Sequence, residues 1–360
     1  MSLEALNKRV QKDLSCLAFG GADWVRPVVH QEGHVYDAII IGGGQCGVGV
    51  AFGLLKERIS NILVIDENPN GYEGPWDTYA RMLTLRTPKH LTSIDLGIPS
   101  LTFRAFWEAQ YGEKAWDELD KIPRREWMNY LRWYRKVLRL PVLNEVTLTC
   151  IAPEGGVHRL QIEGKGAPSS FLLARKIILA TGIQGGGEWY VPDFIKEKLP
   201  SYLYAHTSQR IEMEKLRGKK IGILGGGASA FDNANHVLAE GAAEAHVFIR
   251  GNDLKRINPI RQMELSGMIE RYHTLSDKDK YAAMAHFFKY SQPPTNDIFN
   301  RASAWPGFRL HTGSPWLDVR EERTQAVVTT PHGAFAFDFL IIATGLSCFQ
   351  SIIAAGIAAG

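Results

Sequence analysis

The stretch that decides the fold is DAIIIGGGQCG, which occupies residues 37–47. Its first part, Asp37–Ile41, is apolar after the acid and rich in isoleucine, as is typical of a parallel strand buried on both faces. The glycines follow at once, and an apolar helical pattern continues to about Arg58. A second strand pattern at Asn61–Ile65 ends at Asp66. This order of strand, glycine turn, helix, strand and acid predicts a βαβ unit.

The glycine turn predicts a binding site for a dinucleotide, with a purely structural turn as the alternative. Gly42 allows a tight turn, Gly44 lets the backbone approach a pyrophosphate, and Gly47 permits close packing of helix on sheet. The start of the helix then offers N–H groups to the phosphates. Asp66 lies 24 positions after Gly42, near the spacing of about 20 expected for an acid that binds a ribose hydroxyl. The expected contact residues are Gly42, Gly44, Gln45, Cys46, Gly47, Asp66 and Glu67.

A second unit of the same kind begins at the strand pattern Ile221–Leu224. Its turn has alanine in the third place, which the motif tolerates. The next strand, Ala245–Ile249, ends at Arg250 where the first unit has an acid. A guanidinium binds a 2′-phosphate that an acid would repel, so the pattern favours NADP over NAD. The expected contact residues are Gly225, Gly227, Ala228, Ser229, Ala230 and Arg250.

Each unit is followed by a buried strand pattern that ends in Ala-Thr-Gly, at 176–182 and at 339–345. We expect Thr181, Thr344 and Gly345 to lie near the cofactors. Short strand patterns at Val146–Cys150, Leu160–Ile162 and Phe171–Leu173 predict a small antiparallel meander. The predicted fold is α/β, with two Rossmann-like dinucleotide-binding domains, one inserted in the other. Its expected boundaries are a helical extension at 1–36, a first domain at 37–200 with 326–360, and a second domain at 201–325.

The composition is that of a globular protein with more than one domain. The chain has 360 residues, of which 45% are hydrophobic and 22% charged, and this excludes intrinsic disorder. The formal charge of +3 is spread along the sequence, whereas a nucleic-acid binder would concentrate basic residues on one face. We therefore expect no nucleic-acid partner. The apolar stretch 38–55 contains six glycines and is better explained by the nucleotide turn than by a membrane span.

The cysteines and the N-terminus favour a reduced, cytoplasmic protein. Cys16, Cys46, Cys150 and Cys348 are far apart, so no C-x-x-C pair is available for a zinc ribbon or a vicinal disulfide. Charged residues from Glu4 to Asp13 interrupt what a signal peptide would need as an apolar core. His30 and His34 lack the further ligands of a metal site, and we expect no metal.

The sequence resembles the flavin-containing monooxygenase superfamily, with its Baeyer–Villiger and N-hydroxylating relatives. The matching features run from about Asp37 to Gly345 and include both glycine turns, both Ala-Thr-Gly strands, Trp76 in EGPW, and LRTPK at 85–89. The resemblance implies FAD at the first turn, with Trp76 among its contacts, and NADPH at the second. It also implies Arg86, Lys89 and His206 as catalytic residues near the flavin or nicotinamide. Relatives continue beyond their last Ala-Thr-Gly, so the tail 351–360 makes this chain a candidate truncated form.

The function that the resemblance implies is insertion of one oxygen atom from O2 into a small organic substrate through a C4a-peroxyflavin. A soft or basic nucleophile, an amine or a sulfide, is the expected substrate, and a homodimer is a candidate assembly. Tyr202 stands where a glycine precedes the family's histidine, and Arg86 stands where one subfamily often has asparagine. Two alternatives stay open: an NADPH-dependent flavoprotein reductase, and a non-catalytic dinucleotide-binding remnant.

Overall fold

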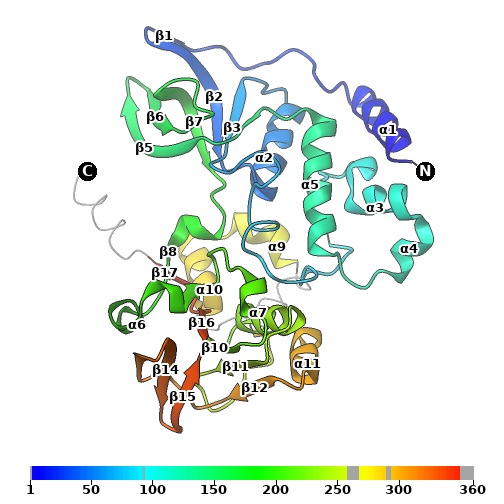
Figure 1. Cartoon of the computed structure of the whole chain (residues 1–360). Helices are drawn as coiled ribbons and strands as arrows, with labels where there is room; N and C mark the ends of the chain where they lie inside the picture. The colour runs from blue at the N-terminus through cyan, green and yellow to red at the C-terminus, as the bar shows by residue number, and fades with distance from the viewer. Residues whose placement is uncertain (1, 92–93, 258–266, 289–292, 349–360) are drawn as a thin grey trace. The chain divides into compact units, whose positions relative to one another are not determined.

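The computed structural model describes residues 2–91, 94–257, 267–288 and 293–348. The chain forms two compact units, Met1–Gly187 and Glu188–Gly360 (Figure 1).

Unit 1 is built on a seven-stranded sheet with the order β4-β3-β2-β7-β6-β5 and with β1 beside β2. The central strand β2 pairs in parallel with β3 and β7, whereas β5, β6 and β7 form an antiparallel meander. This confirms the predicted βαβ unit and the meander. The strands are β1 Val29–His30, β2 Gly33–Ile41, β3 Ile62–Ile65, β4 Val142–Leu143, β5 Thr147–Glu154, β6 Val157–Glu163 and β7 Phe171–Leu179.

The helices of unit 1 pack through one aromatic core. In Figure 1, α5 lies between α2 and the pair α3 and α4. The buried face of α5 carries aromatic side chains at helical spacing, and Tyr130 and Tyr134 also donate hydrogen bonds to the carbonyls of Leu101 and Ile94. The helical segments are α1 Leu3–Cys16, α2 Gln45–Lys56, η1 Pro99–Leu101, α3 Phe103–Tyr111, α4 Glu113–Glu118, α5 Arg124–Leu138 and η2 Ile183–Gly186.

Unit 2 is built on a five-stranded parallel sheet with the order β12-β11-β10-β16-β9. An antiparallel sheet, β13-β14-β15, is also present, and β17 pairs with β8. The strands are β8 Gly187–Trp189, β9 Tyr204–His206, β10 Lys220–Leu224, β11 Glu244–Phe248, β12 Phe308–His311, β13 Asp318–Glu322, β14 Gln325–Thr330, β15 Gly333–Phe337, β16 Phe339–Ile342 and β17 Leu346–Cys348. The helical segments are α6 Asp193–Lys198, η3 Ser201–Leu203, η4 Met213–Leu216, α7 Ala228–Ala239, α9 Met268–Arg271, η5 Tyr272–Thr274, α10 Asp277–Phe288 and α11 Asn296–Ala304.

The strand of the second Ala-Thr-Gly lies in a different sheet from the one expected. β16 pairs in parallel with β10 and β9, so residues 326–348 belong to unit 2 rather than returning to the first domain. Each strand that ends in Ala-Thr-Gly pairs in parallel with the strand that precedes the glycine turn of its own unit, β7 with β2 and β16 with β10. The remaining predicted residues of that segment, 349–360, lie outside the described part of the chain. Within the described ranges, no helix has both the length and the apolar character needed to span a membrane.

Candidate functional site

The first glycine turn follows β2 and accepts no side chain at two of its positions. Gly42 has φ +105°, and a Cβ there would lie 2.4 Å from the carbonyl oxygen of Ala180. A Cβ at Gly47 would lie 1.8 Å from the carbonyl oxygen of Gly42. The turn therefore packs directly on the first Ala-Thr-Gly and on α2. This explains why glycine is needed at both positions.

The start of α2 is open to a ligand. Gly44 caps the helix without a side-chain hydrogen bond, so the first N–H groups keep their capacity to bind phosphate oxygens. A Cβ at Gly44 would lie 3.6 Å from the Cα of Gly74, which places the EGPW segment beside the turn. Gln45 is half-buried and Cys46 is exposed at the start of the helix.

Asp66 lies at the end of β3, where the sequence predicts a ribose-binding acid. It is buried, and its Oδ2 accepts a hydrogen bond from the Gly43 N–H at 2.7 Å. Its Oδ1 accepts from the backbone and the side chain of Asn68. The carboxylate therefore holds the glycine turn in place, and its further lone pairs remain open to a hydroxyl. Glu67, the next predicted contact residue, is exposed.

A cavity of about 520 Å³ lies beside this turn, within unit 1. The lining includes Gly43, Glu73 and basic residues at the end of α5, Arg132, Arg135 and Lys136, with Arg139 directly after the helix. Such a volume lies in the usual range for small-molecule sites. The excess of positive charge suits a phosphorylated ligand.

Glu73 is a buried acid that the sequence analysis did not single out. It forms an ion pair with Arg135, and it accepts hydrogen bonds from Asn144 Nδ2 (2.7 Å) and from the Gly71 N–H (3.0 Å). A Cβ at Gly43 would lie 3.2 Å from the Glu73 Cγ. The Glu73 side chain therefore packs against the glycine turn. In the sequence, the only indication of this role is that Glu73 directly precedes Gly74, which lies beside the turn.

The indole of Trp76 packs against the core of unit 1, and its Nε1 is buried without a hydrogen-bond partner among the described residues. A buried donor of this kind is open to a bound group that supplies an acceptor. Together with the two glycine positions and the open start of α2, this fits the dinucleotide expected at the first turn.

Two predicted catalytic residues, Arg86 and Lys89, lie in unit 1 after the buried Leu85. The Leu85 N–H donates to the carbonyl of Ile122, which fixes this segment ahead of α5. The Lys89 ammonium donates to the Trp116 carbonyl at 2.6 Å and lies 4.9 Å from the Trp116 ring centroid. Lys89 thus stabilises the end of α4, and a catalytic role for it stays a prediction.

The second glycine turn repeats the geometry of the first. A Cβ at Gly225, whose φ is +142°, would lie 2.4 Å from the carbonyl oxygen of Ala343. Gly227 caps α7 without a side-chain hydrogen bond, Ala228 and Ala230 are buried, and Ser229 is exposed. The second Ala-Thr-Gly therefore supports this turn as the first supports Gly42.

The hydrogen bond that each glycine turn makes with its neighbouring strand shows which residue of unit 2 corresponds to Asp66. The Gly42 N–H donates to the Ile65 carbonyl, and the Gly225 N–H donates to the Phe248 carbonyl. The residue that corresponds to Asp66 is therefore the buried Ile249, and the exposed Arg250 corresponds to Glu67. In the sequence, Asp66 and Arg250 each directly follow a strand pattern, so the offset of one residue between them is visible only from these hydrogen bonds.

Other predicted residues in unit 2 have structural partners. Thr344 Oγ1 donates to the Tyr190 carbonyl, and the Gly345 carbonyl accepts from the Tyr190 N–H. Thr181 is exposed in unit 1. His206 ends β9, is buried, and its ring lies 5.2 Å from that of Trp189. Its Nδ1 accepts from the Ser208 N–H at 3.1 Å. The structure thus describes His206 in unit 2 and the other two predicted catalytic residues in unit 1.

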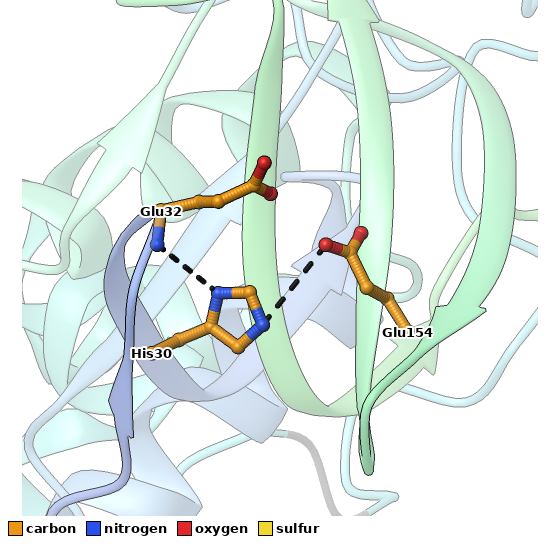
Figure 2. Close-up of side chains that lie close together, drawn as sticks. All are labelled: His30, Glu32 and Glu154. Atoms are coloured by element: carbon orange, nitrogen blue, oxygen red, sulfur yellow. Dashed lines mark hydrogen bonds and ion pairs between the residues drawn. The ribbon is translucent and has the colours of Figure 1, made fainter.

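One group of potential metal ligands occurs among the described residues, at the β1–β2 hairpin and the end of β5 (Figure 2). His30 Nε2 lies 4.0 Å from Glu154 Oε1, and His30 Nδ1 accepts from the Glu32 N–H. Arg159 forms ion pairs with both Glu32 and Glu154. The Arg159 guanidinium therefore already pairs with both carboxylates of this group, and the absence of a metal stays a prediction.

Comparison with known proteins agrees with this architecture. The model of the pyridine nucleotide-disulphide oxidoreductase family matches residues 39–292. Two solved structures share the fold at low sequence identity. Ornithine hydroxylase from Pseudomonas aeruginosa has a TM-score of 0.71 at 16% identity, over 90% of this chain and 86% of that chain. The cadaverine monooxygenase from Erwinia amylovora has a TM-score of 0.68 at 18% identity, over 90% and 81%. The chain belongs to the pyridine nucleotide-disulphide oxidoreductase family and is an oxidoreductase.

A particular relative is much more similar. The FAD-dependent urate hydroxylase of Xanthomonas campestris pv. campestris is 60% identical over 348 residues, which are 96% of this chain and 73% of that protein. The family resemblance and the fold class expected from the sequence are thereby confirmed. The name of this relative gives no support to the expected amine or sulfide substrate.

Proposed function

We propose that this protein is an FAD-dependent monooxygenase that uses NADPH and O2 to hydroxylate urate or a closely related purine. The observation that carries the proposal is the 60% identity to a urate hydroxylase over 96% of the chain. The alignment covers 348 of the 360 residues, and it therefore includes most of the residues that the proposal uses.

The proposed FAD site is the first glycine turn. The N–H groups at the start of α2 would bind the pyrophosphate, and the free lone pairs of Asp66 would accept from the ribose hydroxyls. The basic cavity lined by α5 is proposed to take part of the nucleotide half, and Trp76 Nε1 to donate to the cofactor. Bound FAD would supply the redox chemistry and the activation of oxygen, for which protein side chains have no equivalent.

The proposed NADPH site is the second glycine turn. The N–H groups at Ala228 and Ser229 would bind its pyrophosphate in the same way. Arg250 is exposed two residues beyond the end of β11, and among the described residues no partner is assigned to its guanidinium, which could bind the 2′-phosphate through paired hydrogen bonds. This arrangement supports NADPH as the hydride donor.

Substrate, O2, NADPH and a proton give hydroxylated substrate, NADP and water, so one oxygen atom enters the substrate and the other leaves as water. Two electrons come from NADPH, and two come from the oxidised substrate.

The test is a coupled turnover assay on protein reconstituted with FAD. Urate, ornithine, cadaverine and a dialkyl sulfide are each mixed with NADPH in air, and loss of substrate and of NADPH is followed. The expected result is loss of urate at nearly one equivalent per NADPH, with no loss of the amines or the sulfide. Oxidation of NADPH with all electrons recovered as hydrogen peroxide, across all substrates, would support the reductase alternative instead.

A further inference from the structure

A side-chain hydrogen bond joins the first glycine turn to the aromatic core of unit 1. Trp127 of α5 donates from Nε1 to Oε1 of Gln45 at 3.2 Å. Gln45 is the first residue of α2, immediately after the Gly44 cap. The bond therefore ends at the place where the backbone is open to a phosphate.

This bond decides which way the Gln45 amide faces. An indole N–H only donates, so it requires the carbonyl oxygen of the amide and would be repelled by its NH2 group. With Oε1 directed at Trp127, the NH2 group is directed away from the indole. The NH2 group has no hydrogen-bond partner in the part of the chain that the structure describes, and Gln45 is only half-buried. It is therefore a donor available to a ligand at the turn.

Trp127 is itself held firmly. It is 4% exposed, and its ring centroid lies 5.6 Å from that of Phe103 and 5.1 Å from that of Tyr130. Because the core fixes the indole, the indole fixes the amide. A free glutamine side chain would lose rotamer entropy on binding a ligand, and a side chain already held in place loses less.

We propose that Trp127 is a positioning residue for FAD, which acts by directing the Gln45 NH2 group toward the cofactor. This inference rests on the proposed function, since it requires FAD at the first turn. On this proposal Trp127 acts on FAD binding only through Gln45, so its contribution disappears when the Gln45 amide is absent.

The chain offers a matched control. Trp133 lies on the same helix, is 7% exposed, and donates from Nε1 to Asn7 Oδ1 on α1 at 2.7 Å. Trp127→Phe and Trp133→Phe each keep an aromatic ring in the same core and each remove one indole hydrogen bond. Only the first of these bonds leads to the glycine turn.

The experiment measures the dissociation constant of FAD by quenching of flavin fluorescence during titration of the apoprotein. Trp127→Phe is expected to weaken FAD binding about 3- to 10-fold, the effect of one hydrogen bond. Trp133→Phe is expected to leave the constant within about 2-fold of the parent, although both variants lower the unfolding midpoint of the apoprotein. Gln45→Ala is expected to weaken binding, and the double variant Trp127→Phe/Gln45→Ala to bind no more weakly than Gln45→Ala.

A further variant separates the two ends of the amide. Gln45→Glu keeps an acceptor for Trp127 but has no NH2 group, so it is expected to bind FAD no better than Gln45→Ala. Equal losses for the two tryptophan variants, additive losses in the double variant, or parent-like binding by Gln45→Glu would each overturn the proposal. If the parent protein itself binds no FAD, the proposed function fails, which is a different result from all of these.

Discussion

Replacing Glu73 by alanine should destabilise unit 1 strongly, although Glu73 lies outside the glycine motif. Its side chain is 5% exposed, pairs with Arg135, and accepts from Asn144 and from the Gly71 N–H. Removing one partner of a buried ion pair costs about 3–5 kcal/mol. Because Arg135 is 19% exposed, water compensates part of its lost partner, and we expect a loss near 3 kcal/mol in the free energy of unfolding.

The assay is urea unfolding of the apoprotein, with Glu73→Ala, Arg135→Met and the double variant compared. The double variant should lose at least about 1.5 kcal/mol less than the sum of the single variants, because neither charge is then left without its partner. Glu118→Ala is the control. The Glu118–Lys114 pair is 3.7 Å long with both side chains largely exposed, and its loss should cost less than about 1 kcal/mol. Additive effects, or a Glu73→Ala loss as small as that of the control, would refute this reasoning.

Three further predictions follow from the turns and from unit 2. Gly47→Ala places its Cβ 1.8 Å from the Gly42 oxygen, so it should lower the free energy of unfolding, by about 1–3 kcal/mol or more, and also the affinity for FAD. The control is Gly53→Ala, also in α2, whose Cβ would lie 3.6 Å from Leu96 Cδ1 and which should leave both quantities unchanged. Equal effects of the two variants would contradict the packing argument. Arg250→Ala should raise the KM for NADPH about 10- to 100-fold and leave that for NADH nearly unchanged; equal losses with both coenzymes would assign Arg250 to the fold. Burial, aided by the neighbouring His246, lowers the pKa of His311 from its ordinary value of 6.5 to about 4. The unfolded chain then binds the proton first, so unfolding stability should fall as pH decreases from about 6.5 to about 4, and His311→Gln should flatten the thermal-unfolding profile over that window; an unchanged profile would contradict it.

The elements that the sequence predicted are those that local pattern defines. Both glycine turns, their strands and α2 and α7 follow from residues close together in the chain. The meander β5-β6-β7 was also predicted, because its strands succeed one another. The residue types around each turn are enough to predict it because the same contact requires glycine in both units, Gly42 with Ala180 and Gly225 with Ala343.

What the sequence did not reveal depends on pairing between distant segments. The patterns at 176–182 and 339–345 are nearly the same, so nothing local says that β7 and β16 belong to different sheets. The position of Arg250 relative to Asp66 likewise became clear only from the hydrogen bonds of Gly42 and Gly225. Glu73 begins the EGPW segment, but nothing in that segment identifies its partner Arg135, which lies 62 residues away.

The central claim is that one atom of O2 enters a purine substrate, and isotope labelling tests it most directly. The protein, reconstituted with FAD, is given urate and NADPH under 18O2 in ordinary water, and the early product is analysed by mass spectrometry. The account predicts one 18O atom in each product molecule, with one NADPH consumed for each urate. Product that carries no 18O, or consumption of NADPH with urate unchanged, would contradict it.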